Sequence, residues 1–140
     1  ESVYNDLSVK GKTFTPEKER IMAQGELEKK IELNWLSAFY GGLLTPKQRD
    51  VMRMHCEEDL SLGEIAQEAG ISRQAVHDLL SRAAHQLFEL EGKLGMAARF
   101  TRMQRGLEQC QQALEEKRYD DARAMIASLR ALDQEDSNGL

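Results

Sequence analysis

The chain contains few of the residues on which disulfide scaffolds, zinc sites and membrane segments depend. Its two cysteines, Cys56 and Cys110, lie far apart, and neither has a second Cys or a His at metal-ligand spacing. The three histidines, His55, His77 and His85, do not form a zinc-binding pattern either. No apolar run is long enough to cross a bilayer or to form a signal-peptide core. These absences argue against disulfides, metals and a membrane partner, and they predict a reduced, cytoplasmic setting.

The motifs of common enzymes are missing as well. The sequence has no Gly-rich phosphate-binding loop, no nucleophile elbow and no pair of carboxylates in an expected pocket. Acidic residues are plentiful, but they fall on the solvent faces of the predicted helices. We therefore predict a protein that is not an enzyme, with no catalytic residue and no cofactor.

Residues that break helices or favour strands are also scarce. Only two prolines occur, runs of β-branched residues are absent, and apolar residues recur at helical spacing. With 41% hydrophobic residues, the 140-residue chain can form one small domain with a modest core. The predicted fold class is all-α, with a helix-turn-helix core, a long third helix and a C-terminal helical hairpin.

The segment 61–82, SLGEIAQEAGISRQAVHDLLSR, has the pattern of a helix-turn-helix. Ser61 and Glu64 form a capping-box pair, Gly70 supplies the positive φ of the turn, and Ser72 caps a second helix. The core-facing positions are apolar: Ile65, Ala66, Ala69, Ile71, Val76, Leu79, Leu80 and Ala83. This spacing is typical of the two-helix unit whose second helix enters a DNA major groove. An ordinary helical hairpin is the alternative.

Two earlier helices are predicted to complete the core. One begins at Thr45, because Pro46 suits a first helical turn and Gln48 closes a second capping box. Its buried face consists of Val51, Met54 and His55. The other runs from Glu26 to Tyr40 and carries an apolar stripe of Leu27, Ile31, Trp35, Leu36, Phe39 and Tyr40. We expect this stripe to cover the core, and an aromatic binding surface is the alternative.

The second motif helix continues its apolar spacing well beyond the motif. The stripe comprises Val76, Leu79, Ala83, Leu87, Leu90 and Leu94. A compact three-helix unit cannot cover a stripe of this length, so the C-terminal helices or a second subunit must cover the surplus. On this ground we predict a homodimer.

The chain divides into three predicted segments. Residues 1–25 form a flexible leader, residues 26–98 the helix-turn-helix domain, and residues 99–140 a helical hairpin with a polar tail. The hairpin is locally similar to half of a tetratricopeptide repeat and needs a neighbour, within the chain or in a dimer. For the residues before Met22, two origins stay open: a natural N-terminal extension, or a segment upstream of the natural start.

The exposed side chains at the start of the second motif helix are candidate DNA-reading residues. They are Ser72, Arg73, Gln74, His77 and Ser81. Arg73 can pair with guanine and Gln74 with adenine, and each such pair discriminates by about 1–3 kcal/mol. The candidate phosphate contacts are Lys47, Arg49 and Arg82.

The charge of the chain opposes a simple DNA-binding interpretation. The net charge is −5, and residues 45–85 hold five Lys or Arg against seven Asp or Glu. DNA affinity comes largely from neutralising phosphates, and Asp78 lies where phosphates would approach. Segregation of charge by face, or a dimer that doubles the contacts, would reduce this conflict. DNA reading, binding of RNA or protein, and a purely structural use therefore stay open.

Taken together, these motifs resemble the YlxM-like family of small bacterial helix-turn-helix proteins. The resemblance rests on Trp35-x-x-x-Phe39-Tyr40, on Leu44-Thr45-x-Lys47-Gln48 and on the segments 61–66 and 71–76. It covers about residues 27–100. The family is also similar to region 4 of sigma factors, and its genes tend to lie beside those of the signal recognition particle GTPase or its receptor.

The resemblance implies a regulatory or accessory role in that protein-targeting pathway. One form is a regulator that binds duplex DNA. The other is an accessory protein that binds the GTPase, its receptor or its RNA without reading DNA. A free-standing sigma region 4 is disfavoured, because the sequence has no polymerase-binding region 2 and its long helix and hairpin exceed that module. The resemblance says little about the hairpin and does not include the residues before Met22.

Overall fold

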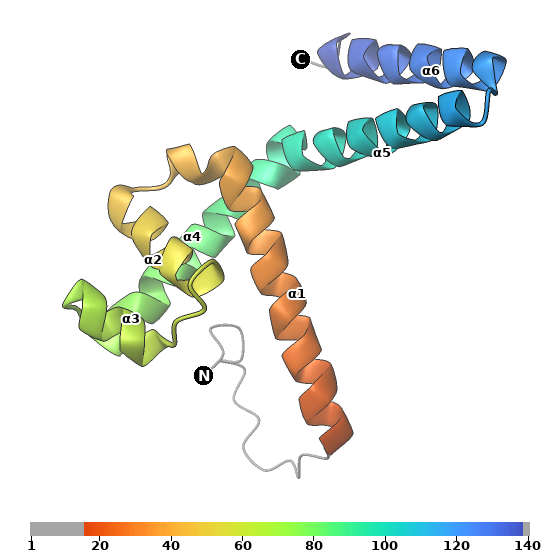
Figure 1. Cartoon of the computed structure of the whole chain (residues 1–140). Helices are drawn as coiled ribbons and strands as arrows, with labels where there is room; N and C mark the ends of the chain where they lie inside the picture. Colours follow the sequence, from red (N-terminus) through yellow and green to blue (C-terminus); the bar gives the residue numbers. More distant parts are fainter. Residues whose placement is uncertain (1–15, 139–140) are drawn as a thin grey trace. The chain divides into compact units, whose positions relative to one another are not determined.

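The computed structural model describes residues 16–138, which form six α-helices and one short 3₁₀ helix, with no strand among them (Figure 1). The elements are α1 (Pro16–Tyr40), η1 (Gly41–Leu43), α2 (Pro46–Cys56), α3 (Leu62–Ala69), α4 (Arg73–Leu94), α5 (Met96–Glu115) and α6 (Tyr119–Asn138). The predicted all-α fold class is confirmed.

The helices divide after Leu94 into an N-terminal unit, α1 to α4, and a C-terminal hairpin, α5 and α6. Gly95, at a left-handed φ of 61°, ends α4, and α5 begins at Met96. The boundary predicted from the sequence, between residues 98 and 99, falls four residues beyond this break. The apolar spacing runs on through this break, so periodicity alone did not locate it.

Helix α1 begins at Pro16, ten residues before the predicted start at Glu26. Proline is well suited to a first helical position, and the charged residues that follow it are good helix formers. The segment lacks an apolar stripe, which is why it was predicted to be part of a leader. The rest of that leader, residues 1–15, and residues 139–140 of the tail lie outside the described residues.

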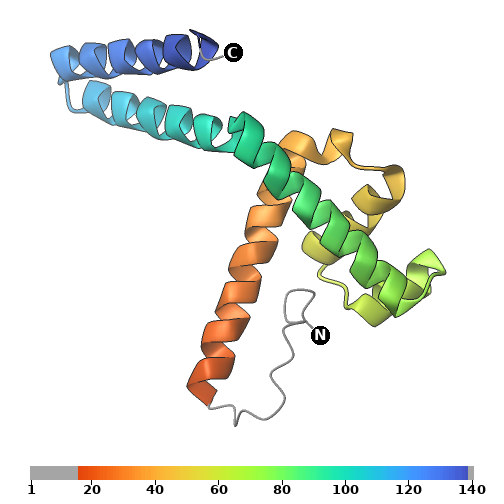
Figure 2. The ribbon, with the colours of Figure 1, turned by 180° about the vertical axis from the view of Figure 1, so that it is seen from behind.

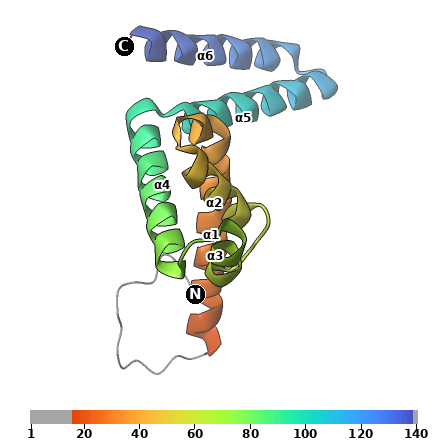
Figure 3. The same ribbon diagram turned by 90° about the vertical axis from the view of Figure 1, so that its left-hand side faces the viewer.

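The core of the N-terminal unit is built around α4, which contacts α1, α2 and α3 (Figures 2 and 3). The large buried side chains are Leu33, Leu36, Tyr40, Leu44, Val51, Met52, Met54, Leu62, Ile65, Val76, Leu80 and Leu87. The apolar stripe of α4 is therefore covered as far as Leu87 within one chain, and only Leu90 and Leu94 remain partly or largely exposed. The surplus that a compact three-helix unit leaves uncovered is therefore confined to Leu90 and Leu94, and the partner predicted for it stays a prediction.

The predicted stripe of α1 is also only partly correct. Leu33, Leu36 and Tyr40 face the core, whereas Leu27, Ile31 and Trp35 are 58%, 61% and 40% exposed. Both sets have helical spacing, because α1 carries apolar residues on two adjacent faces, and spacing does not tell which face is buried. Among the motif positions, Ala69 is likewise exposed rather than in the core.

The two helices of the C-terminal hairpin run antiparallel and side by side (Figures 1 and 3). Small side chains make up most of its buried set, which consists of Ala97, Cys110, Ala113, Ala122 and Leu129. Gly106 lies against Leu129, and a Cβ at Gly106 would overlap the Leu129 side chain. The helices therefore pack closely, but they enclose little apolar volume.

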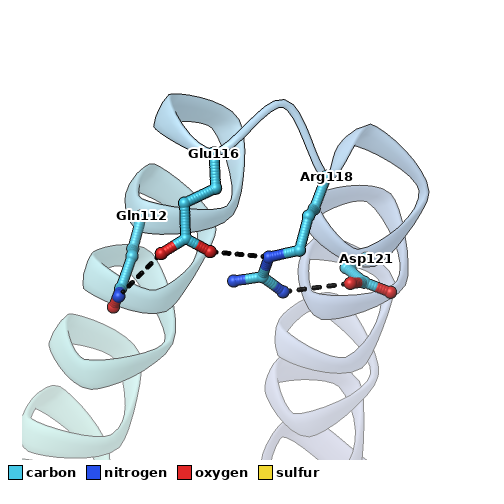
Figure 4. A network of polar contacts seen from close by, with 4 residues as sticks. All are labelled: Gln112, Glu116, Arg118 and Asp121. Atoms are coloured by element: carbon cyan, nitrogen blue, oxygen red, sulfur yellow. Dashed lines mark hydrogen bonds and ion pairs between the residues drawn. The ribbon is translucent and has the colours of Figure 1, made fainter.

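A compact turn closes the hairpin. Lys117 adopts a left-handed φ of 60°, and the Arg118 amide donates to the Ala113 carbonyl at 2.7 Å, as in a Schellman cap. Figure 4 shows Arg118 bridging Glu116 at 2.8 Å and Asp121 at 3.0 Å. The predicted hairpin is thus present in the described structure.

Candidate nucleic-acid interface

The turn between α3 and α4 has the predicted geometry. The Ser61 hydroxyl accepts from the Glu64 amide at 3.2 Å, and the Glu64 carboxylate accepts from the Ser61 amide at 2.8 Å. Gly70 has a φ of 67°, and the Ile71 amide donates to the Ala66 carbonyl at 3.1 Å. These bonds complete a Schellman cap on α3 and set the direction in which α4 leaves the turn.

Helix α4 begins with the candidate reading residues. The Ser72 hydroxyl accepts from the Ala75 amide at 3.0 Å, so this side chain caps the helix. Arg73 and Gln74 follow on the first turn and are exposed. Arg73 extends past Gly63 of α3, where a Cβ would lie 3.8 Å from its Nε.

Gln74 has a partner on the same helix. Its Nε2 donates to Asp78 Oδ1 at 3.1 Å, and the His77 Nδ1 lies 3.8 Å from the same oxygen. This bond uses one of the two N–H donors of the Gln74 amide and leaves the other donor and the carbonyl oxygen available. Asp78 therefore holds the side chain of one candidate reading residue, which its sequence position did not suggest.

Ser81 and Arg82 lie two turns further along α4. Ser81 is half-buried and Arg82 is exposed, and both border a shallow hollow with His85 and Lys93. Helix α4 thus carries five of the candidates over about its first three turns, and Ser72 caps it.

The two candidates on α2 differ from each other. Lys47 is exposed in the first turn of α2. Arg49 donates through Nε to the Gly41 carbonyl at 3.1 Å and through its terminal nitrogen to the Leu44 carbonyl at 3.4 Å. These carbonyls follow the end of α1, so Arg49 braces the η1 turn. In the sequence, this role is indicated by the Gly41-Gly42 pair, which ends α1 and begins eight residues before Arg49.

Several acidic side chains of the motif region are already engaged. Glu58 pairs with Arg53, and Asp59 Oδ1 lies 2.6 Å from the Lys30 Nζ. The hydrogen bond from Lys30 lowers the pKa of the Asp59 carboxyl. Glu64 serves the α3 cap. Negative charge is therefore concentrated around the α2–α3 turn, and Asp78 is the only acidic residue between Arg73 and Arg82.

A groove runs beside the exposed apolar face of α1, the helix for which the sequence left an aromatic binding surface open as the alternative. It lies between α1, η1 and α2, has a volume of about 670 Å³, and is lined by Ile31, Trp35, Ala38, Met52, Arg49 and Arg53 among others. In the sequence, the feature that indicates this groove is the second apolar face of α1, which carries the only tryptophan of the chain.

Two titratable groups near this core are held neutral. Burial, followed by the charge of Lys30, lowers the pKa of His55 to about 4, and burial raises the pKa of Cys56 to about 11. Cys56 is therefore a protonated thiol at neutral pH. Within residues 16–138 no cluster of His, Cys, Asp and Glu suitable for a metal ion is found, and no helix there has the length and apolarity that crossing a membrane requires.

The fold and the α3–α4 geometry define a helix-turn-helix protein. A family model described as "Putative helix-turn-helix protein, YlxM / p13 like" matches residues 27–126, and the chain belongs to this family, UPF0122. The match extends through α5 into α6, further than the resemblance noted from the motifs.

The relatives of the chain are bacterial proteins that carry the family name. A UPF0122 protein of Geobacillus kaustophilus is 39% identical over 110 residues, which cover 79% of this chain and 99% of the relative. A UPF0122 protein of Symbiobacterium thermophilum is 45% identical over 93 residues, covering 66% and 87% of the two chains.

Proposed function

We propose that the chain is a non-enzymatic regulatory protein of the signal recognition particle pathway, and that the start of α4 binds duplex DNA. The observation that supports DNA binding is the placement of Arg73 and Gln74, exposed on the first turn of the second helix of a helix-turn-helix. The pathway follows from the family resemblance, whose basis is the position of family genes beside those of the particle's GTPase or its receptor.

The local charge supports this interface better than the count along the sequence does. From Arg73 to Arg82 the two arginines outweigh the single Asp78, while Glu58 and Asp59 are engaged with Arg53 and Lys30 elsewhere. In physiological salt, the electrostatic potential of a close pair of opposite charges is weak beyond about 10 Å. The approach of a phosphate backbone to α4 is therefore less opposed than the regional charge of −2 suggests.

DNA binding is tested with a pool of random duplex DNA and the full chain. We expect binding that weakens with rising salt, and an enriched sequence motif. The Arg73→Ala and Gln74→Ala variants should lower affinity by roughly 5- to 100-fold and relax the motif at one position each. Arg105→Ala, on exposed α5 surface, is the matched loss of a cation and should change little. Absence of duplex binding in low salt at micromolar protein would contradict the proposal.

A second candidate is direct contact with a component of the particle without DNA reading. The groove beside Trp35 favours it, because its lining combines apolar side chains with Arg49 and Arg53, as protein-binding surfaces do. The single tryptophan allows a direct test, since its fluorescence should change when the purified GTPase or receptor is added. Trp35→Ala should weaken a pull-down of that partner, whereas an RNA-only interaction would leave the Trp35 signal unchanged.

A further inference from the structure

The C-terminal hairpin exposes an apolar face that its own two helices do not cover. On α5 this face consists of Phe100, Met103, Leu107 and Leu114, and on α6 of Tyr119 and Ile126. Most of these side chains are between 41% and 57% exposed. The hollow between the helices, about 460 Å³, is lined by Met103, Leu107, Ile126 and Leu129, which shows that both helices contribute to one surface.

Such a hairpin forms one of the two helical layers that a four-helix core requires. An isolated pair of helices whose buried side chains are mostly Ala and Cys gains little from burial, whereas two such layers can enclose a four-helix core. Two copies facing each other would each contribute the exposed parts of these six side chains to one apolar interface core.

The charged residues beside the face are acidic on α5, whereas on α6 they include two arginines that take no part in the ion pairs of the hairpin turn. Glu108 and Glu115 each follow a face residue of α5 by one position, which places them about 100° further round the helix, on the edge away from α6. On α6, Asp120 follows Tyr119 by one position, and Asp133 borders the hollow but is paired with Arg99. Arg123 and Arg130 each follow a face residue of α6 by four positions. Arg130 borders the same hollow as Leu107 and Ile126, so this edge lies on the same side of the hairpin.

We propose that this face binds the same face of a second copy of the chain, with α5 of one copy against α6 of the other about a two-fold axis parallel to the helices. The charge pattern selects this arrangement, because it brings the acidic edge of each copy to the basic edge of its partner. The other two-fold arrangement, α5 against α5, would oppose Glu108 and Glu115 to their own copies. Since Leu107 and Ile126 border one hollow, Glu108 and Arg123 lie within about one turn of the same level.

The experiment is sedimentation equilibrium of the full chain over a range of concentrations. The wild type should approach twice the monomer mass of 15.9 kDa. Glu108→Arg with Glu115→Arg, and separately Arg123→Glu with Arg130→Glu, should each weaken the dimer at least tenfold. An equimolar mixture of the two variants should restore a dimer, since one is then basic on both edges and the other acidic on both.

Matched controls separate this interface from general charge effects. Arg105→Glu changes an exposed charge on the opposite side of α5 and should leave the dimer intact. The chain with all four edge charges exchanged should dimerise like the wild type. Circular dichroism verifies that each variant keeps its helices. A wild type that stays monomeric, as it would if the hairpin packed on its own N-terminal unit, overturns the proposal. The proposal is also overturned if the charge reversals leave the dimer unchanged, or if the mixture of the two variants stays monomeric. This test is independent of whether the chain binds DNA.

Discussion

The N-terminal unit and the C-terminal hairpin are built from the same helices but bury different side chains. In the N-terminal unit the fully buried residues are large, and they include Tyr40, Leu33, Ile65, Leu80 and Leu87. In the hairpin, four of the five buried residues are Ala or Cys, and most of the large apolar residues other than Leu129 are exposed. Because burial of apolar area is the main favourable term in folding, the first unit gains more from its own core than the hairpin gains from the contact between its two helices.

The largest expected difference comes from truncating a core side chain. Leu87→Ala empties part of a fully buried site in α4 and should lower the free energy of unfolding by about 2–5 kcal/mol. Leu94→Ala, seven residues later on the same helix, removes a half-exposed side chain and should cost much less. Urea unfolding followed by Trp35 fluorescence reports on this unit alone, because the chain has one tryptophan. Equal effects of the two substitutions would mean that the core does not end near Leu87.

A pH dependence should be confined to the N-terminal unit. His55 has a pKa of about 4 in the folded state and about 6.5 when unfolded, so between these values the unfolded chain binds a proton that the folded chain does not. Stability should therefore fall as the pH drops from 6.5 towards 4, by on the order of 2 kcal/mol. Unfolding followed by Trp35 fluorescence between pH 7 and 5, above the titration of most carboxyls, measures the slope. His55→Leu should flatten it, whereas His85→Leu, on an exposed position of α4, should not.

Two glycines should respond to the same substitution with opposite signs. Gly106→Ala places a Cβ into the Leu129 side chain and should destabilise the hairpin by about 1–3 kcal/mol. Gly92→Ala, in α4, meets no atom within 4 Å and should stabilise by about 0.5–1 kcal/mol, as expected of an open helical position. Circular dichroism during urea unfolding measures both. Stabilisation by Gly106→Ala would indicate that α5 and α6 are further apart than described.

The smallest expected effects concern the two left-handed helix caps. The N-terminal unit uses Gly70, so Gly70→Ala should cost about 1 kcal/mol, while the hairpin uses Lys117, so Lys117→Gly should gain up to about 1 kcal/mol. Thermal unfolding of both variants measures the pair. A destabilising Lys117→Gly would show that the Lys117 side chain contributes more than its strained φ costs.

Much of the helix-turn-helix could be predicted because its signals are local. The caps at Ser61 and Ser72 and the turn at Gly70 depend on residues within one or two turns of each other, and the structure confirms their bonds. The positions of the candidate reading residues on α4 are predicted by the same local helical spacing. What could not be predicted is which partner each polar side chain takes. Arg49 binds carbonyls of the η1 turn, and Gln74 is held by Asp78.

The sequence by itself therefore determined the fold class, the helix-turn-helix and the family, because these depend on local spacing and capping. Only the tertiary structure decided which of the two apolar faces of α1 is buried and where the stripe of α4 stops being covered. It also showed that the hairpin buries small residues and exposes large ones. The physical reason is that helical periodicity tells which residues share a face, whereas burial depends on which other helix reaches that face.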